Sequence, residues 1–147
     1  MSGYGPLAMK TAAVSGLLAV ALLAVGVAAV VAAPVPTVKL ETRTEKEALA
    51  KGHIKVRVKV PKPSKVRARA KFSAGVSPNF RLDPVTKPVD RDGTGFRFEL
   101  SEKQRRIIAA AIDVCASTEV TVKARALRLA GRPATRLRAA LRAPDDC

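Results

Sequence analysis

The segment IKVRVKV, residues 54–60, alternates strictly between apolar and basic residues. A period of two is typical of a β-strand that buries one face and exposes the other to solvent. The apolar positions hold isoleucine and valine, whose β-branched side chains favour strands. Pro61 and Pro63 follow at once, and proline cannot donate to a strand ladder. We therefore expect a half-buried strand that ends at residue 60.

The same alternation recurs along the rest of the chain. Residues 66–72, with the sequence VRARAKF, repeat the apolar and basic pattern before a turn signal of small residues. We expect this segment and residues 54–60 to form two consecutive antiparallel strands that pair with each other. Further predicted strands are residues 94–100 and 118–126, with a short first strand at 38–40. Pro78 and Pro84 bracket residues 79–82, which predicts a short edge strand there.

Two segments carry a capping box, the pattern that begins a helix. Ser101 and Gln104 have the required spacing, at which each side chain can bond the backbone of the other residue. Apolar residues follow at helical spacing, which predicts a helix over residues 102–112. A second box begins at Thr44, and Gly52 fits the position of a C-terminal stop. The helix between them is expected to be short and marginal.

An uncharged apolar segment precedes the strands. The 147 residues include 27 Lys and Arg against 12 Asp and Glu, a net charge of +15, yet no charge lies between Lys10 and Lys39. One basic residue, an apolar run over 14–31 and small residues at 28–33 are typical of a secretory signal peptide. An uncleaved membrane anchor is the alternative, because the run is about as long as the shortest span of a bilayer. Translation from Met1 and from Met9 both remain open.

Cys115 and Cys147 are expected to form a disulfide, because a signal peptide directs a chain to an oxidising compartment. The segment 135–143 alternates like a strand, but two of its leucines are also four positions apart, as in a helix. As a strand it would return from the preceding strand through a turn centred on Gly131, and paired residue numbers would then sum to 262. The two cysteines have the same sum, so this hairpin would bring them together.

Six or seven short strands separated by turn signals indicate an antiparallel β-sandwich. The layout resembles immunoglobulin-like or fibronectin-type-III-like modules of bacterial secreted and surface proteins. The resemblance lies in the opening at residues 51–58, the strand 96–101 that runs into a short helix, and the hairpin around Gly131, and it covers residues 39–143. It implies a mainly β fold, a small antiparallel Ig-like β-sandwich with one short helix before the last hairpin. The core tryptophan and the tyrosine corner of antibody-type domains are missing.

These expectations divide the chain into three parts. Residues 1–33 are the signal peptide or the anchor helix, residues 34–38 are a short linker, and residues 39–147 are the sandwich domain. We therefore expect the protein to be secreted or extracytoplasmic, or to be anchored to the membrane by its N-terminal helix.

Basic residues occupy the outward positions of the alternating strands. Such a face attracts polyanions through its long-range field, and outside a cell these would be anionic wall polymers, acidic lipids or nucleic acid. The plainer interpretation is a solvated face whose lysines and arginines keep strands from aggregating. The candidate polyanion-binding residues are Lys55, Arg57, Lys59, Arg67, Arg69, Lys71, Lys123, Arg125, Arg136 and Arg138.

No local sequence motif points to catalysis or to a metal. His53 has no nucleophile or orienting acid beside it, and one histidine with two cysteines cannot build a four-ligand zinc centre from these residue types alone. Asp90 and Asp92 are spaced like calcium ligands, but Ser101 stands where an EF-hand loop needs its last carboxylate. We expect a turn there, no cofactor and no metal.

We therefore expect a non-enzymatic, secreted or envelope-associated binding or structural module. Its partner would be an anionic polymer, a membrane surface or an envelope protein. One alternative is a protein that binds polyanions with the basic faces as its main function. The other is an enzyme, or an inhibitor that uses the proline-containing segment 73–92 as its binding loop. Strong salt dependence of binding would distinguish the polyanion-binding protein, because salt screens charge contacts.

Overall fold

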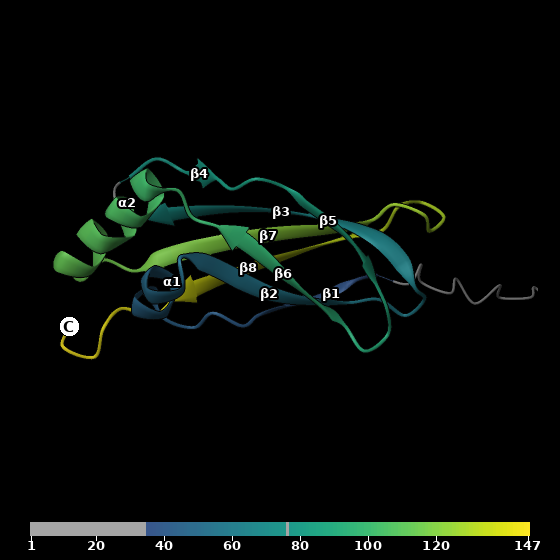
Figure 1. The fold of residues 1–147 in the computed structure, drawn as a ribbon, viewed down its shortest axis with the longest axis horizontal. Coiled ribbons are helices and arrows are strands. Elements are labelled where there is room, and N and C mark those ends of the chain that lie inside the picture. Colours follow the sequence, from purple (N-terminus) through teal and green to yellow (C-terminus); the bar gives the residue numbers. More distant parts are fainter. Residues whose placement is uncertain (1–34, 76) are drawn as a thin grey trace, which may run out of the picture. The chain divides into compact units, whose positions relative to one another are not determined.

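The structure, a computed structural model, describes residues 35–75 and 77–147, and the predicted signal peptide or anchor lies outside them. The described chain is mainly β: eight strands form two antiparallel sheets, and two short helices accompany them (Figure 1). No helix among these residues is long and apolar enough to cross a membrane. The predicted predominance of antiparallel strands is confirmed.

The first sheet has three strands in the order β1-β2-β6. β1 spans Thr37–Leu40, β2 spans His53–Lys59 and β6 spans Thr94–Glu99. The central strand, β2, is the IKVRVKV segment moved by one residue, and its three inward apolar side chains are fully buried. β1 includes residues 37 and 38, the last two residues of the predicted linker.

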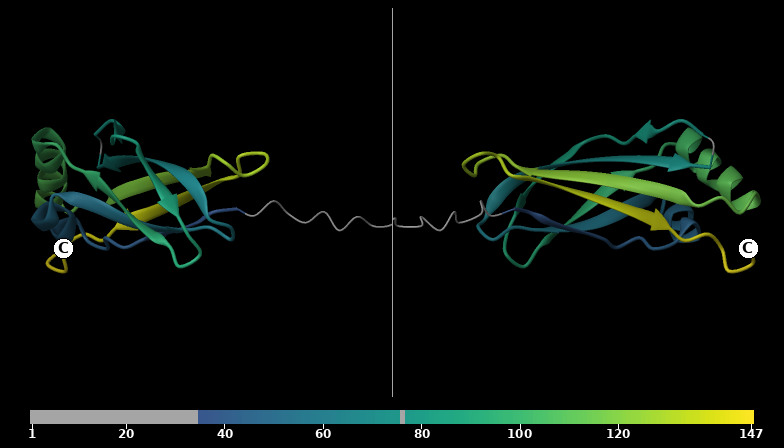
Figure 2. Two further views of the ribbon diagram at one scale, coloured as in Figure 1. Left: turned by 45° about the vertical axis from the view of Figure 1, so that its right-hand side comes forward. Right: turned by 180° about the vertical axis from the view of Figure 1, so that it is seen from behind.

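The second sheet is larger. β3, Ser64–Ala74, lies at its centre, with β7, Thr118–Ala126, along one edge and β8, Ala134–Leu141, beyond β7. β4, Phe80–Arg81, and β5, Val85–Val89, pair one after the other with the opposite edge of β3. Figure 2 shows β3, β7 and β8 side by side, coloured from teal to yellow. The ambiguous C-terminal segment is therefore a strand.

The apolar faces of both sheets contribute to one core. Ile54, Phe96 and Phe98 of the first sheet are at most 1 % exposed, as are Phe72 and Val122 of the second. Burial of such side chains is the main favourable term in folding. Each sheet therefore turns its polar face to solvent, and the two polar faces point in opposite directions.

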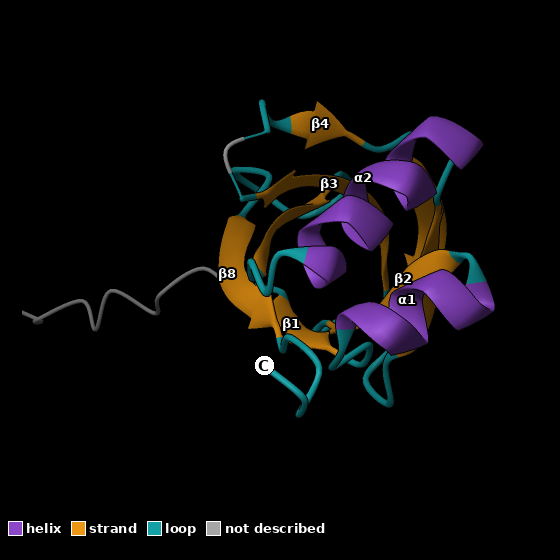
Figure 3. Ribbon diagram, turned by 90° about the vertical axis from the view of Figure 1, so that its left-hand side faces the viewer, coloured by secondary structure: helices purple, strands orange, loops and turns teal. Residues whose placement is uncertain are grey.

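Two helices lie across the same end of the sheets (Figure 3). α1 spans Glu45–Lys51 and α2 spans Glu102–Asp113. The side chains of Thr44 and Ser101 each accept a hydrogen bond from the backbone N–H three residues later. The box at Ser101 is complete, whereas at Thr44 the Glu47 carboxylate accepts from the Arg43 N–H in place of the Thr44 N–H. The resemblance implied only the helix before the last hairpin. α1 forms as well, because Gly52 ends it in the left-handed conformation, with φ of 70°, and its N–H bonds the last turn.

β2 and β3 do not pair, contrary to the sequence prediction. They belong to different sheets, and the chain crosses between the sheets through Pro61-Lys62-Pro63. Neither proline can donate a ladder hydrogen bond, so this connection does not close a tight hairpin. The apolar faces of the two strands meet in the core instead. β2 pairs with β6, and β3 pairs with β7.

The segment 73–92, which the inhibitor hypothesis takes as its binding loop, contains strand structure. It contains β4, a two-residue remnant of the predicted edge strand 79–82, and β5, which the sequence did not predict because Pro88 interrupts it. Proline is tolerated there because β5 lies at the edge of its sheet. The Lys87 ammonium donates to the Gly95 carbonyl of β6 at 3.2 Å and so joins this edge to the first sheet.

The last hairpin has a different register from the predicted one. Thr118 is opposite Leu141, so paired residue numbers sum to 259 and not to 262. The difference is odd, and side chains alternate between faces, so the predicted sum would place opposite faces together. It would set inward Val122 against exposed Ala140, whereas the observed register sets it against partly buried Leu137. Burial of the leucines therefore determines the register.

Cys115 and Cys147 are nevertheless joined by the predicted disulfide, with their Cα atoms 5.5 Å apart. Continuing the observed register past the strand ends places Pro144 opposite Cys115. The Cys147 N–H donates to the Pro144 carbonyl at 3.1 Å. This turn brings Cys147 back toward Cys115. The bond ties the C-terminus to the segment that follows α2.

Replacing both cysteines by serine, C115S/C147S, is expected to lower the free energy of unfolding by about 3–4 kcal/mol, the entropic contribution of closing a loop of this length. The closed loop has a sequence separation of 32 residues. Denaturant titration of the oxidised wild type and the variant measures the difference. The reduced wild type is the control, and its unfolding midpoint should equal that of the variant. An unchanged midpoint in both would contradict the expectation.

Glu45, the first residue of α1, is an unusual buried group. Its side chain is fully buried, and neither carboxylate oxygen has a hydrogen-bond partner among the described residues. Burial of a charged group without a partner costs free energy. The N-terminal end of a helix offsets part of this cost, because its dipole favours a negative charge. On balance we expect Glu45 to destabilise the fold.

The substitution Glu45→Met removes the carboxylate and keeps a helix-forming side chain. It is expected to raise the free energy of unfolding by about 1–2 kcal/mol, as measured by chemical denaturation. Glu47→Met is the matched control, because the Glu47 carboxylate accepts hydrogen bonds from the Lys51 ammonium and the Arg43 N–H. The control should lose stability. A loss in both variants would show that Glu45 stabilises the fold.

Candidate anion-binding surface

The ten predicted cations lie on two different faces. Lys55, Arg57 and Lys59 belong to β2 and lie on the outer face of the first sheet. The remaining cations belong to β3, β7 and β8. The predicted continuous face across β2 and β3 does not exist, because these strands are in different sheets. We call the outer face of the larger sheet the second-sheet face; its predicted cations are Arg67, Arg69, Lys71, Lys123, Arg125, Arg136 and Arg138.

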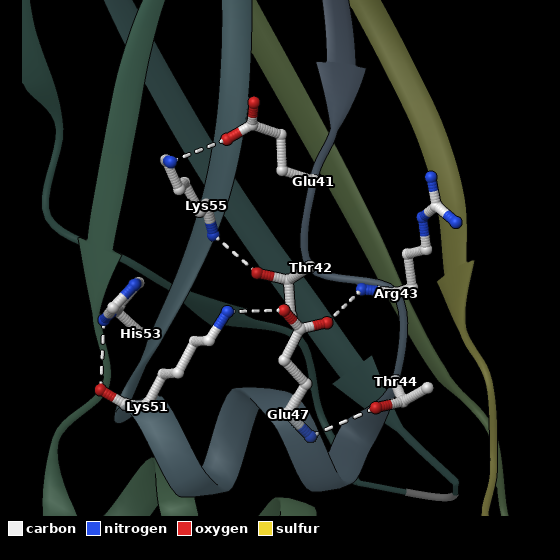
Figure 4. Close-up of polar contacts among 8 residues, drawn as sticks. All are labelled: Glu41, Thr42, Arg43, Thr44, Glu47, Lys51, His53 and Lys55. Carbon is white, nitrogen blue, oxygen red and sulfur yellow. Dashed lines mark hydrogen bonds and ion pairs between the residues drawn. The ribbon is translucent and has the colours of Figure 1, made fainter.

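A carboxylate partly neutralises the cations of the first sheet. Glu41 follows β1, and its oxygens lie 3.0 Å from the Lys55 ammonium and 2.8 Å from Nε of Arg57 (Figure 4 shows the contact with Lys55). The hydrogen bonds from Arg57 and from Lys55 lower the pKa of Glu41, because they favour its charged form. Two of the three predicted cations on this face are thus held by one acid.

A second carboxylate organises the neighbouring end of α1 (Figure 4). Glu47 accepts hydrogen bonds from the Lys51 ammonium at 2.7 Å and from the Arg43 N–H at 2.9 Å, and these bonds lower its pKa. His53 begins β2, and its Nδ1 lies 3.0 Å from the Lys51 carbonyl. These contacts join the segment before α1 to the helix and to β2. They give His53 a backbone partner near the surface.

On the second-sheet face, the strand register sets like charges opposite each other. Arg67 is opposite Arg125, and Arg69 is opposite Lys123. Lys123 is in turn opposite Arg136 on β8. Directly opposed residues have Cα atoms about 4.5–5.5 Å apart, and like charges at such positions destabilise a sheet. A row of three cations therefore crosses three neighbouring strands.

Almost none of these cations has a carboxylate partner. Arg138 lies 2.7 Å from the Glu119 carboxylate, with both side chains substantially exposed. The other six cations of the second-sheet face make no ion pair with any residue that the structure describes. The second-sheet face therefore differs from the outer face of the first sheet in two ways. It has more predicted cations, and a smaller share of them is paired with a carboxylate.

The second-sheet face has a groove beside the connection between β4 and β5. A groove of about 520 Å³ is bounded there by the segment Arg81-Leu82-Asp83-Pro84. Arg81 adds a cation that the sequence analysis missed. The edge strand there was predicted from the flanking prolines, and two residues are too few for alternation to show which way Arg81 faces. Asp83 is the one carboxylate among the residues that line the groove. The remaining lining residues are Arg67, Arg69, Ala70, Lys71, Thr121, Lys123 and Arg136.

Arg132 is a second cation that the sequence analysis missed. It follows Gly131 in the loop between β7 and β8, where the period-two pattern no longer applies. It lines a cavity of about 200 Å³ together with cations of β3 and β7. A turn signal marks such a position as a loop, but it does not say which way the side chain faces.

Asp90 forms the expected turn before β6. Its carboxylate accepts hydrogen bonds from the backbone N–H groups of Asp92 and Gly93, at 3.1 and 3.0 Å. Gly93 has φ of 96°, a conformation that glycine adopts without steric cost. Among the described residues, no group of three or more histidine, cysteine or acidic side chains is placed to hold a metal ion.

Sequence similarity does not assign this surface to a known function. A comparison of the chain with protein-family models found no match, and a comparison with curated proteins found none either. The function is therefore inferred from the charge and the geometry of the described residues.

The substitution Glu41→Gln tests the acid that holds the first-sheet cations. Because the pKa of Glu41 is lowered in the folded state, its stabilisation is present above the unfolded value near 4.5 and is lost as pH falls through the folded value. E41Q should cost about 0.5–1 kcal/mol at neutral pH, since the partners are partly exposed. Its unfolding free energy should also fall less steeply below pH 4.5. Denaturant titrations across the acid range measure both effects.

The control for Glu41 is Asp146→Asn, which makes the same charge change. Asp146 is 90 % exposed and lies 3.7 Å from the Lys46 ammonium. This variant should keep the wild-type pH profile within error. A profile for E41Q that parallels the wild type would show that the two ion pairs do not contribute to stability.

Proposed function

We propose that this protein is a non-enzymatic, secreted or envelope-associated module with an Ig-like sandwich fold, which binds anionic polymers with its second-sheet face. One observation carries the proposal: three cations, Arg69, Lys123 and Arg136, stand in one row across β3, β7 and β8 without an ion pair to any described residue. The ligand chemistry is a chain of phosphate or carboxylate groups.

The strand order supports the Ig-like part of the proposal. In a constant-type immunoglobulin domain, strands A, B and E lie in one sheet and strands C, F and G in the other. β1, β2 and β6 have the first arrangement, and β3, β7 and β8 have the second. One departure is β5, which pairs with β3 and not with β6. Another is the disulfide, which lies outside the sheets at one end.

The electrostatics support binding of a multivalent anion. Like charges held opposite each other raise the free energy of the folded protein, and a bound polyanion lowers it again by neutralising several at once. Counterions released from the polymer add to the affinity, so that binding weakens steeply with salt. The chain's net charge of +15 also steers such ligands toward the surface.

The sequence pattern of a signal peptide or anchor supports a place outside the cytoplasm. Anionic wall polymers, acidic lipid headgroups and extracellular nucleic acid present repeated negative charge there. The groove residues are mainly cationic and include no aromatic side chain. Stacking of bases on aromatic rings is a large part of binding to single-stranded nucleic acid. A phosphate-rich polymer or headgroup layer therefore fits this face better than nucleic acid does.

The double variant R69Q/K123Q tests the proposal against K59Q/R97Q, which removes the same charge from the outer face of the first sheet. Wild type should bind long-chain polyphosphate and vesicles containing phosphatidylglycerol, with affinity falling at least about tenfold between about 50 and 200 mM salt. R69Q/K123Q should weaken binding about tenfold or more, whereas the control should change it by about threefold or less. Titration calorimetry and vesicle co-sedimentation measure these affinities.

Three results would overturn the proposal. Equal losses in the two variants would mean that only net charge matters. No binding at low salt would leave the second-sheet face as a solubility device. A hydrolytic activity of the pure protein that disappears on changing one carboxylate or serine would refute the non-enzymatic role.

A further inference from the structure

One end of the second-sheet face holds a small cavity that the proposed function does not by itself explain. The cavity has a volume of about 200 Å³, and it is lined by Arg67, Arg69, Lys123, Arg125, Arg132 and Leu127. Five of these six side chains are cationic, and none is a carboxylate. The larger groove, by contrast, includes Asp83. This cavity is therefore a concentrated positive site within the longer basic face.

Four of the five cations form a block that the sheet holds in place. Arg67 and Arg69 alternate along β3, and Arg125 and Lys123 stand directly opposite them on β7. Residues two apart on a strand are separated by about 7 Å, and opposed residues by about 5 Å. The strand pairing fixes the Cα positions at these spacings. Repulsion between the four charges therefore cannot move the residues apart. The site is preorganised for an anion with several charges close together.

Arg132 adds the fifth cation at an energetic cost. Its backbone has φ of 44°, in the left-handed region that non-glycine residues seldom adopt, and it directly follows Gly131 with φ of 73°. The Arg132 N–H donates to the Leu129 carbonyl at 3.0 Å. The Ala126 N–H donates to the Pro133 carbonyl, also at 3.0 Å, and closes the loop. Unfavourable conformations of this kind occur at functional sites, where the surrounding structure maintains them.

We propose that these five residues form a discrete binding site for a condensed phosphate, a ligand in which several phosphate groups are joined in a row. Arginine side chains bind phosphate oxygens in pairs, and four of the five cations are arginines. A condensed phosphate carries several charges over a few ångströms and can contact both strands and the loop together. We expect a single orthophosphate to contact fewer of these side chains at once. The site rests on the proposed function, because it would hold one segment or end of a longer anionic polymer.

The experiment is calorimetric titration of the full chain with tripolyphosphate, with orthophosphate and sulfate as comparison anions. Wild type should bind tripolyphosphate at least about tenfold more tightly than orthophosphate or sulfate. R132Q should weaken tripolyphosphate binding about tenfold, whereas R128Q should change it by about threefold or less. Arg128 lies in the same loop and does not line this cavity, so R128Q removes the same charge from the same neighbourhood.

Arg132→Gly is a second variant that removes the charge and keeps the loop folded, because glycine adopts φ of 44° without the steric cost that arginine has there. R132G should unfold at or above the wild-type temperature and still lose tripolyphosphate affinity as R132Q does. Addition of tripolyphosphate should also raise the unfolding temperature of wild type more than that of R132G.

Two results would overturn the discrete site. One is an equal loss in R132Q and R128Q, and the other is equal affinity for tripolyphosphate and orthophosphate. If long-chain polyphosphate still binds in a manner sensitive to R69Q/K123Q in those cases, the proposed function stands without this site. If neither ligand binds at low salt, the proposed function fails as well.

Discussion

The packing of the two apolar sheet faces against each other determines where the charged strand residues lie. β2 and β3 carry the same alternation, but they meet across the core, so their cations point in opposite directions. Burial of a large apolar side chain such as Phe72 or Phe96 contributes about 1.5–3 kcal/mol, whereas a like-charged pair on opposed strands costs about 0.2–1 kcal/mol. The core can therefore maintain rows of cations that repel one another.

The cations of the two outer faces differ in their carboxylate partners. On the first sheet, Glu41 binds two cations of β2, and nearby Glu47 links the helix α1 to the segment before it. Those charges are part of how the domain is held together. On the second-sheet face, acids are scarce, and the cations Arg67, Arg69 and Lys123 have no carboxylate partner among the described residues. This difference is the reason that the proposed anion-binding site lies on the second-sheet face.

Local features could be predicted from the residues because the interactions behind them are local. The Ser101 capping box bonds groups three residues apart, and α2 begins where that box predicts. The strand at 118–126 matches its prediction in full, because alternation over nine residues shows which face is buried. β5 escaped prediction because Pro88 and its short length hide the same pattern. Arg81 and Arg132, which belong to the candidate sites, lie where no periodic pattern exists.

Alternation thus identified the longer strands, their buried faces and most of the outward cations, and two cysteines behind a predicted signal peptide indicated the disulfide. Alternation does not predict which strands pair, because a half-buried strand can pair with any neighbour that turns its apolar face to the same side. The folded chain joined β3 to β7 and separated β2 from β3, so the basic surface lies on residues 66–74 and 118–141. Register followed the same logic: inward Leu137 of β8 meets inward Val122 of β7, and this long-range burial brings Arg69, Lys123 and Arg136 into one row.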